Sequence, residues 1–391
     1  MKSEVIIQIF SGGFSAKAVS YEYVEQKLVS VLPRLPVRKV IMGWQPDKAL
    51  YEKTAAFLAK RNIDCYLWFP VFSETGMLRE LSALTDFRGQ EIKCRPNEDF
   101  SFCCPNNPQN IERILDIFEH EFASIRFSGV FLDRVRYPSF ANGYESGQGF
   151  RNVFSCFCPQ CLAVYEREKF NIELLKDALS RPFRTPLGIT AYRDGGDYVF
   201  EDPVFSGFFA LKAGIISESL GRICRYFRER NYSIGFDVFA PFLSPFVGQD
   251  LKVLSGLCDF IKPMMYRVTQ APAGLPFETE ALLRQTNASV LQRQRFYELL
   301  GFNPANNLFD LTFTAKELQN LTASSSCPVY AGVEINKIDN IAETDPGYIE
   351  ETIKGYSGTG IKGFVLSWNL LDAPEENIAK AAEVIERIQN V

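Results

Sequence analysis

Eight short segments dense in Val, Ile, Phe and Tyr recur along this chain of 391 residues, separated mostly by amphipathic helical patterns. None alternates strictly between apolar and polar residues, which is typical of parallel strands buried on both faces. The predicted strands are Val5–Phe10, Lys39–Gly43, Asp64–Phe69, Gly129–Asp133, Ser233–Phe239, Phe260–Tyr266, Val329–Glu334 and Gly363–Trp368. The predicted helices are Tyr21–Leu32, Lys48–Lys60, Asn110–Ile125, Ser206–Arg230, Gln249–Leu257, Glu278–Leu300, Thr314–Ala323 and Glu375–Ile388. This alternation predicts one α/β domain over residues 1–391, a (β/α)8 (TIM) barrel.

Two connections of the predicted barrel are long. Phe72–Pro108 follows the third strand, and Pro138–Pro203 follows the fourth. Both begin at the C-terminal end of a strand, where barrels of this kind place their active-site loops. We therefore interpret them as insertions that shape a pocket. Residues 139–204 show too little apolar periodicity for a separate domain, and we expect them to form an insertion that carries the clustered cysteines.

Composition and charge exclude several classes of function. The formal net charge of −5 provides no basic field for a nucleic acid. The start MKSEVIIQIF lacks the features of a signal peptide, and no apolar stretch reaches the roughly eighteen residues of a membrane span. We therefore expect a cytoplasmic protein with neither nucleic acid nor membrane as a partner. A single histidine, His120, argues against a His-rich catalytic metal site and against a Ser-His-Asp triad.

The cysteines suggest a metal site. Cys156, Cys158 and Cys161 form a C-x-C-x-x-C segment in the second insertion, and Cys104 in the first insertion is the best fourth ligand, with Cys103 as the fallback. Four thiolates suit a structural zinc ion, and they leave no open position for a catalytic water. We expect one Zn²⁺ ion to join the two insertions. Unrelated reduced cysteines are the alternative.

Two groups of segments bring a family resemblance. CPNNP and CFCPQCLAVYEREKF resemble the zinc-binding elements of glycoside hydrolase family 42 β-galactosidases, and this resemblance implies that Cys104, Cys156, Cys158 and Cys161 bind a structural zinc. GVFLDRVRYPS, SIGFDVFAP and GQDLKVLSGLCDFIKPMMY look like segments of uncharacterised glycoside-hydrolase-like barrels. Together the resemblances cover residues 100–270 closely. They imply a barrel of the hydrolase class, and family 42 enzymes are often trimers, so a homo-oligomer is possible.

One departure from family 42 matters. In that family the acid/base residue on the fourth strand is a Glu preceded by Asn, whereas this strand ends Phe131-Leu132-Asp133-Arg134. The resemblance therefore does not carry over the β-galactosidase activity.

Three acids lie inside otherwise apolar predicted strands: Asp133, Asp237 and Glu334. A carboxylate there is costly unless it is paired or used, and glycoside cleavage usually needs two carboxyl groups. By analogy with family 42, Glu334 would be the nucleophile and Asp133 the acid/base. The reverse, with Asp133 as nucleophile and Asp237 or Glu334 as the acid, stays open, and each acid could instead be structural.

Other polar and aromatic residues at predicted strand ends could form the wall of a sugar pocket, because sugar C–H faces stack on aromatic rings. The substrate-binding candidates are Trp44, Trp68, Arg136, Tyr137, Tyr266, Asn336 and Trp368. Arg136 could bind an acidic substrate group or pair with Asp133.

These observations predict a glycoside hydrolase that cleaves an O-glycosidic bond with two carboxylates at the C-terminal face of the barrel, with no organic cofactor. The alternative is a non-catalytic barrel that binds carbohydrate. A metal-dependent hydrolase fits the single histidine poorly.

Overall fold

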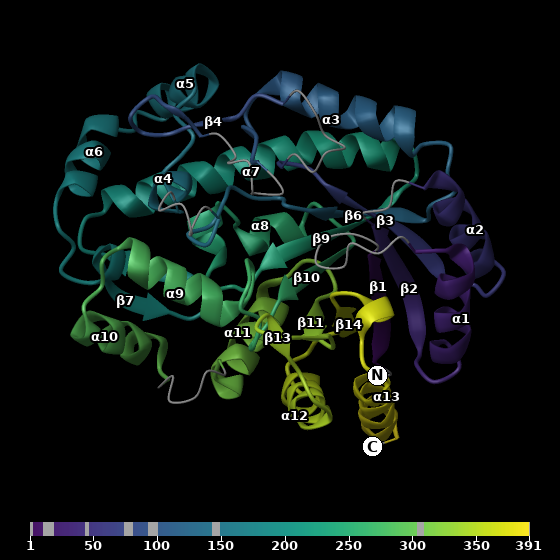
Figure 1. Cartoon of the computed structure of the whole chain (residues 1–391). Helices are drawn as coiled ribbons and strands as arrows, with labels where there is room; N and C mark the ends of the chain where they lie inside the picture. Colours follow the sequence, from purple (N-terminus) through teal and green to yellow (C-terminus); the bar gives the residue numbers. More distant parts are fainter. Residues whose placement is uncertain are drawn as a thin grey trace.

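The computed structural model describes residues 3–10, 19–43, 47–73, 81–92, 101–142, 149–302 and 309–390. Its centre is one sheet of eight parallel strands in the order β10-β9-β6-β3-β2-β1-β14-β11 (Figure 1). The strands are β1 (Glu4–Phe10), β2 (Val37–Gly43), β3 (Asp64–Pro70), β6 (Gly129–Asp133), β9 (Ser233–Phe239), β10 (Phe260–Met264), β11 (Tyr330–Glu334) and β14 (Gly363–Ser367). A parallel bridge from Ile261 to Val329 brings the two edge strands together. The predicted (β/α)8 barrel and all eight of its strands are confirmed.

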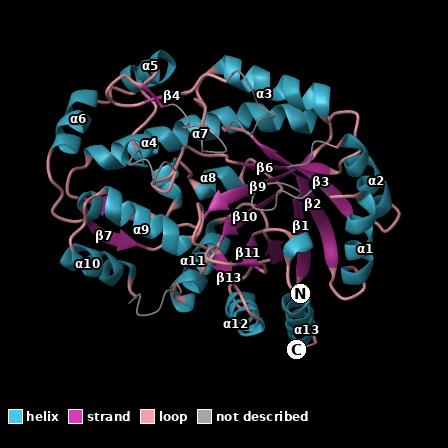
Figure 2. Ribbon diagram, viewed as in Figure 1, coloured by secondary structure: helices cyan, strands magenta, loops and turns pink. Residues whose placement is uncertain are grey.

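Helices surround the barrel on its outer side (Figure 2). Those that follow the strands are α1 (Tyr21–Val31), α2 (Lys48–Ala59), α3 (Pro108–Glu121), α7 (Val204–Glu229), α8 (Leu251–Ser255), α9 (Leu275–Gln285), α10 (Val290–Leu300), α11 (Leu311–Ser324), α12 (Pro346–Ser357) and α13 (Glu375–Gln389). One of them, α7, is long and apolar enough to cross a membrane by length and composition. Eleven of its side chains are buried, and the core helix of a soluble protein passes the same test, so this is weak evidence for a span.

The insertions add small elements at the edge of the barrel. After β3 come β4 (Leu84–Thr85) and β5 (Glu91–Ile92). After β6 come α4 (Gly149–Val153), α5 (Pro159–Arg167), α6 (Ile172–Ser180), η1 (Pro186–Gly188), β7 (Ile189–Arg193) and β8 (Asp197–Phe200). Three further short elements follow later strands: η2 (Ser244–Val247), the pair β12 (Lys337–Ile338) and β13 (Ala342–Glu343), and η3 (Leu370–Asp372).

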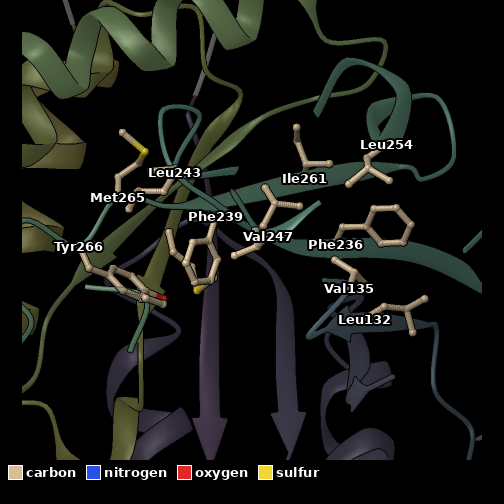
Figure 3. Close-up of a cluster of buried hydrophobic side chains, with 14 of the residues drawn as sticks. Leu132, Val135, Phe236, Phe239, Leu243, Val247, Leu254, Ile261, Met265 and Tyr266 are labelled. Carbon is tan, nitrogen blue, oxygen red and sulfur yellow. The ribbon is translucent and has the colours of Figure 1, made fainter. Parts of the chain in front are cut away.

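The barrel has two apolar layers because successive strand residues point to opposite faces. The inside is filled by large side chains, among them Ile6, Ile41, Tyr66, Phe131, Phe260 and Tyr330. The outer faces of the strands pack beneath the helices in one continuous core. Figure 3 shows part of this outer core, where Leu132, Phe236 and Ile261 from three adjacent strands lie near Val247 and Leu254. These layers fix the strand ends, where the candidate site residues lie.

Two details differ from the sequence-based helices. The predicted helix Glu278–Leu300 is two helices, because α9 ends at Gln285, Asn287 has a left-handed backbone (φ 52°), and Ser289 with Gln292 forms a capping box that starts α10. The helix α12, which packs against β11 and α13, was not among the predicted helices.

Candidate functional site

Three charged side chains lie at one level inside the barrel, on three adjacent strands. Lys262 on β10 is the register partner of Asp237 on β9. On β6 and β9, Leu132 pairs with Phe236, so the next residues along both strands, Asp133 and Asp237, are also at one level. Because side chains alternate between the faces of a strand, this register gathers the three charges in one row.

Asp237 is the most unusual of the three. It is 5% exposed, and its Oδ2 accepts a hydrogen bond of 3.0 Å from Lys262 Nζ. Its Oδ1 is buried and has no hydrogen-bond partner among the described residues. Burial raises the pKa of Asp237 to about 7 against the opposing effect of Lys262, and the negative charge of nearby Asp133 adds to the rise. Asp237 can therefore gain or lose a proton near neutral pH.

Lys262 itself is fully buried and joins two groups of the site. Its Nζ donates to Asp237 and, at 2.5 Å, to the Tyr266 hydroxyl. Burial alone would lower the pKa of Lys262, yet the facing Asp237 and Tyr266 raise it above its ordinary value, so the ammonium stays charged. A glycine on β11 leaves room for this side chain, since a Cβ at Gly332 would lie 2.9 Å from Lys262 Cε.

Asp133 is held by two donors, one on each oxygen. Trp68 Nε1 donates to its Oδ2 at 3.0 Å, and the backbone N–H of Arg134 donates to its Oδ1 at 2.5 Å. The donor residue Arg134 has a left-handed backbone, with φ of 52°. Such a conformation in a non-glycine residue costs free energy and persists where surrounding contacts hold it, here including a 2.6 Å hydrogen bond from Arg134 Nη1 to Ser73 Oγ. Asp133 is half-buried, so it is more accessible than Asp237.

Glu334 at the end of β11 has a different environment. It is 1% exposed and accepts hydrogen bonds from the backbone N–H groups of Arg267, Val268 and Thr269. The hydroxyls of Thr269 and Tyr348 also donate to it. Burial raises the pKa of Glu334, and these donors oppose the rise. Glu334 thus ties the segment that follows β10, through residues 267–269, and α12, through Tyr348, to the end of β11.

Some of the remaining predicted binding residues lie at the strand ends near Lys262. Tyr266 and Trp368 lie close together, with ring centroids 6.4 Å apart. Asn336 links the ends of β11 and β14, since its Oδ1 accepts hydrogen bonds from the backbone N–H groups of Trp368 and Asn369 at 2.7 and 2.9 Å. Trp68 binds Asp133 as described above. Trp44 lies outside the described residues.

Arg136 and Tyr137 point into the packing around the second insertion. Arg136 is 5% exposed, donates to Tyr137 O and Asn142 Oδ1, and lies over the ring of Phe239. Among the described residues no ion pair joins Arg136 to Asp133. Tyr137 is fully buried, and the Lys212 ammonium lies 4.4 Å from its ring centre.

The four predicted metal ligands do come together. The sulfurs of Cys104, Cys156, Cys158 and Cys161 all lie within 4.8 Å of one another, and all four residues are buried. Cys104 Sγ is 3.4 Å from Cys158 Sγ and 3.5 Å from Cys161 Sγ. The fallback ligand, Cys103, is outside this group and lies near Val71 O. The structure thus places Cys104, and not Cys103, beside the three thiols of the C-x-C-x-x-C segment, while metal binding by these four residues stays a prediction.

Hydrogen bonds around the cluster connect the two insertions. Thr85 N donates to Cys156 Sγ, and Phe157 N donates to Thr85 O. Asn106 Nδ2 donates to Gln160 O at 2.7 Å. The four thiols and these hydrogen bonds together form a contact region, here called the joint, which holds the two insertions against each other beside the barrel.

Several buried charged residues near these sites were not among the sequence-based candidates, among them Lys262 and Glu278. Lys262 lies in the apolar segment Phe260–Tyr266, where a charged side chain is as unusual as the three acids, so its residue type and position were a usable signal. Glu278 is 2% exposed and accepts from Ser139 Oγ and the backbone N–H of Ala273. Its position in a predicted helix gave no comparable signal.

Comparison with known proteins places the fold. No protein-family model matches the chain, and no curated protein matches its sequence. Among solved structures, the PgaB (BpsB) glycoside hydrolase domain from Bordetella bronchiseptica is similar, with a TM-score of 0.58 at 12% identity over 98% of this chain and 99% of that chain. A Group IV chitinase from Ostrinia furnacalis has a TM-score of 0.49 at 8% identity, with full coverage of both chains. The first of these similarities shows that the chain shares its barrel fold with that domain, while the similarity to family 42 stays a resemblance of sequence segments.

Proposed function

We propose that this protein hydrolyses an O-glycosidic bond at the C-terminal end of its barrel, with Asp133 and Asp237 as the two carboxyl groups. The observation that carries this proposal is the placement of the two acids at one level on neighbouring strands, one half-buried and one titrating near neutral pH. The similar PgaB domain is a glycoside hydrolase domain by name, which supports the class of reaction.

The register favours a retaining mechanism. Neighbouring parallel strands lie about 4.8 Å apart, and carboxyl groups at one level keep a separation of roughly 5 Å if their side chains extend in parallel. Retaining glycosidases hold their two carboxyl groups about 5–5.5 Å apart, whereas inverting enzymes need a wider gap for water. We therefore expect the product to keep the anomeric configuration of the substrate.

The two environments suggest different roles. Asp237 holds a proton over part of the neutral range, which suits the general acid that protonates the leaving oxygen and later the base that activates water. Asp133 is more exposed, and Trp68 and the Arg134 N–H orient its oxygens, which suits the nucleophile. Lys262 and Tyr266 would keep Asp237 in place, and Tyr266 with Trp368 would form part of the sugar-binding wall.

This assignment gives Glu334 a positioning role in place of the nucleophilic role that the family 42 analogy implied. Its hydrogen bonds to Arg267, Val268, Thr269 and Tyr348 occupy its oxygens. A nucleophile needs an oxygen that can reach the anomeric carbon. We propose that Glu334 fixes the segment after β10, next to Tyr266.

The test is hydrolysis of a panel of α- and β-aryl glycosides by the wild type and the variants Asp133→Asn, Asp237→Asn and Glu334→Gln. We expect the first two variants to lose activity by orders of magnitude while staying folded, as judged by circular dichroism and unfolding midpoint. Activity that survives Asp133→Asn and Asp237→Asn but disappears in a folded Glu334→Gln variant would overturn the assignment. Product anomers followed by NMR would test retention.

A second candidate, a barrel that binds carbohydrate without cleaving it, is favoured by one observation. The unpartnered Oδ1 of Asp237 could accept a hydrogen bond from a sugar hydroxyl. Glycan binding by wild type, weakened by Asp237→Ala and without turnover of any panel member, would select this function.

We further propose that the four-cysteine cluster holds one structural Zn²⁺ ion. Tetrahedral Zn–S bonds of about 2.3 Å place the sulfurs about 3.8 Å from one another. The sulfurs here all lie within 4.8 Å, and the two shortest separations are 3.4 and 3.5 Å, so the donors fit the ion with small adjustments. The ion would stabilise the joint between the insertions and leave no coordination site for catalysis.

Metal analysis of purified protein tests this site directly. We expect close to one zinc per chain in the wild type and loss of zinc from Cys104→Ser and Cys158→Ser. The variant Cys103→Ser is the matched control, because its thiol is next in sequence but outside the cluster. Wild-type protein without bound metal after growth in zinc, or equal zinc loss from the control, would contradict the proposal.

A further inference from the structure

Two cysteines at the other end of the barrel lie outside both sites described above. Cys258 comes just before β10, and Cys327 comes just before β11. Their sulfurs are 3.8 Å apart, and both are free thiols. Cys258 is 6% exposed, whereas Cys327 is half-buried and so can be reached by a small reagent.

The position of this pair is unusual because β10 and β11 form the weakest junction of the sheet. Every other pair of neighbouring strands is joined over four to six residue pairs. Between β10 and β11 the described bridge is Ile261 with Val329. The bond from Ile261 N to Pro328 O and the bond from Ser326 N to Ser255 Oγ, at 2.9 Å, add to it.

We propose that Cys258 and Cys327 are a redox modification site, at which a reversible disulfide closes the junction between β10 and β11. The sulfurs need to approach by less than 2 Å to reach the roughly 2.05 Å of an S–S bond. The residues around them are already held together by the Ser326–Ser255 bond, so the movement involves side chains more than backbone.

The environment of Cys327 favours it as the attacking thiol. A hydrogen bond from the Cys258 thiol lowers the pKa of Cys327, and a contact with Ser325 adds to this effect. The Cys327 thiolate would attack a small disulfide such as oxidised glutathione and release one glutathione thiolate. The Cys258 thiol would then lose its proton and attack the mixed disulfide, releasing a second glutathione. In all, two protein thiols are oxidised and one glutathione disulfide is reduced to two thiols.

The bond would constrain the unfolded chain by closing a long loop. The two cysteines are 69 residues apart in sequence, and cross-links over loops of this length stabilise the folded state by restricting the unfolded one. For a chain of this size we expect the unfolding midpoint to rise by about 2–5 °C on oxidation.

The experiment treats the 391-residue protein, purified after growth in zinc, with oxidised glutathione. The remaining thiols are then alkylated, and the cross-links are mapped by peptide mass spectrometry. We expect a Cys258–Cys327 cross-link and the rise in unfolding midpoint, both reversed by dithiothreitol. Cys258→Ser and Cys327→Ser should lose both responses, whereas Cys65→Ser, which changes a buried thiol on β3, should keep them.

Mapping also defines the outcomes that overturn the proposal. Recovery of Cys258 and Cys327 as separate alkylated peptides, or cross-linked to other cysteines such as Cys224 or Cys104, would overturn it. A cross-link that forms but lowers the midpoint would contradict the role at the junction. If a serine variant fails to fold, the map and midpoint of the wild type alone still decide the question.

Discussion

Asp237 on β9 and Glu334 on β11 are both acids that the barrel buries almost completely, with 5% and 1% of their surface exposed. Their hydrogen bonds differ sharply. Glu334 accepts from three backbone N–H groups and two hydroxyls. Asp237 accepts from Lys262 through one oxygen, and its other oxygen is buried without a partner among the described residues.

This difference in hydrogen bonding decides which of the two buried acids can exchange a proton with a substrate. A buried carboxylate surrounded by donors is a structural element, and the removal of its acceptor oxygens leaves several donors unsatisfied. A buried carboxylate with a free oxygen and a pKa of about 7 still has a proton to exchange. Burial alone, which both acids share, does not separate these two cases.

The largest expected effect is on catalysis by Asp237. Asp237→Asn removes the proton donor, and we expect kcat/KM to fall by about 10²–10⁴-fold on the substrate that the panel identifies. The unfolding midpoint should stay within a few degrees, because the amide keeps the volume. Steady-state kinetics and thermal unfolding measure both.

Asp64→Asn is the matched control for that variant. Asp64 on β3 also pairs with a lysine in register, Lys39 on β2, at 3.9 Å, but its side chain is 53% exposed. Its loss should leave kcat/KM unchanged. If Asp64→Asn lowered kcat/KM as much as Asp237→Asn does, the effect would come from losing any charge pair on the sheet, and Asp237 would have no special role in catalysis.

The second effect is on stability through Glu334. Glu334→Gln puts an amide group among donors that all need an acceptor, so we expect the free energy of unfolding to fall by about 2–4 kcal/mol in urea titrations. Glu52→Gln, an exposed change on α2, should alter it by less than about 0.5 kcal/mol. A Glu334→Gln variant as stable as the wild type would show that the hydrogen-bond network is not the role of this acid.

The third effect is a pH dependence with a definite sign. In the unfolded chain Asp237 has an ordinary pKa of about 3.9, whereas the folded value is about 7. The folded state therefore holds this proton more tightly, and the stability from it is fully present below about pH 4 and lost as pH rises through 7. Between these limits the wild type should lose on the order of 3 kcal/mol relative to Asp237→Asn. The free energy of unfolding of both proteins would be measured from about pH 4 to about pH 7. If the two curves ran parallel, Asp237 would not have the raised pKa.

The barrel could be predicted from the sequence because each strand is a run of apolar residues. Such a run is a local pattern, so it can be recognised without knowing which strands lie next to it. The sequence also singled out Cys104 in place of Cys103, and the structure brings the Cys104 sulfur to the other three thiols. The break between α9 and α10 was readable in principle, since Ser289 and Gln292 have the spacing of a capping box.

The difference between Asp237 and Glu334 could not be predicted in the same way. The donors to Glu334 come from residues 267–269, more than sixty positions earlier, and from Tyr348 on α12. The partner of Asp237 is set by the register of β9 and β10. Both are tertiary properties, so residue type and strand position made the two acids look alike.

The smallest effect tests whether Trp68 orients the other carboxylate. Trp68→Phe removes one hydrogen bond of 3.0 Å to Asp133, worth about 1 kcal/mol or somewhat more for a charged acceptor, so kcat should fall about 5–10-fold with KM changed less than twofold. The control is Phe10→Leu, because Phe10 packs edge-on against the Trp68 ring at 5.4 Å but donates nothing to Asp133 through its side chain. If both variants lower the unfolding midpoint and leave kcat alone, Trp68 is a packing residue. If only Trp68→Phe lowers kcat, the tryptophan acts in catalysis by orienting Asp133, next to Asp237 and Lys262. Trp68 would then serve a reactive carboxylate, whereas the donors around Glu334 serve a structural one.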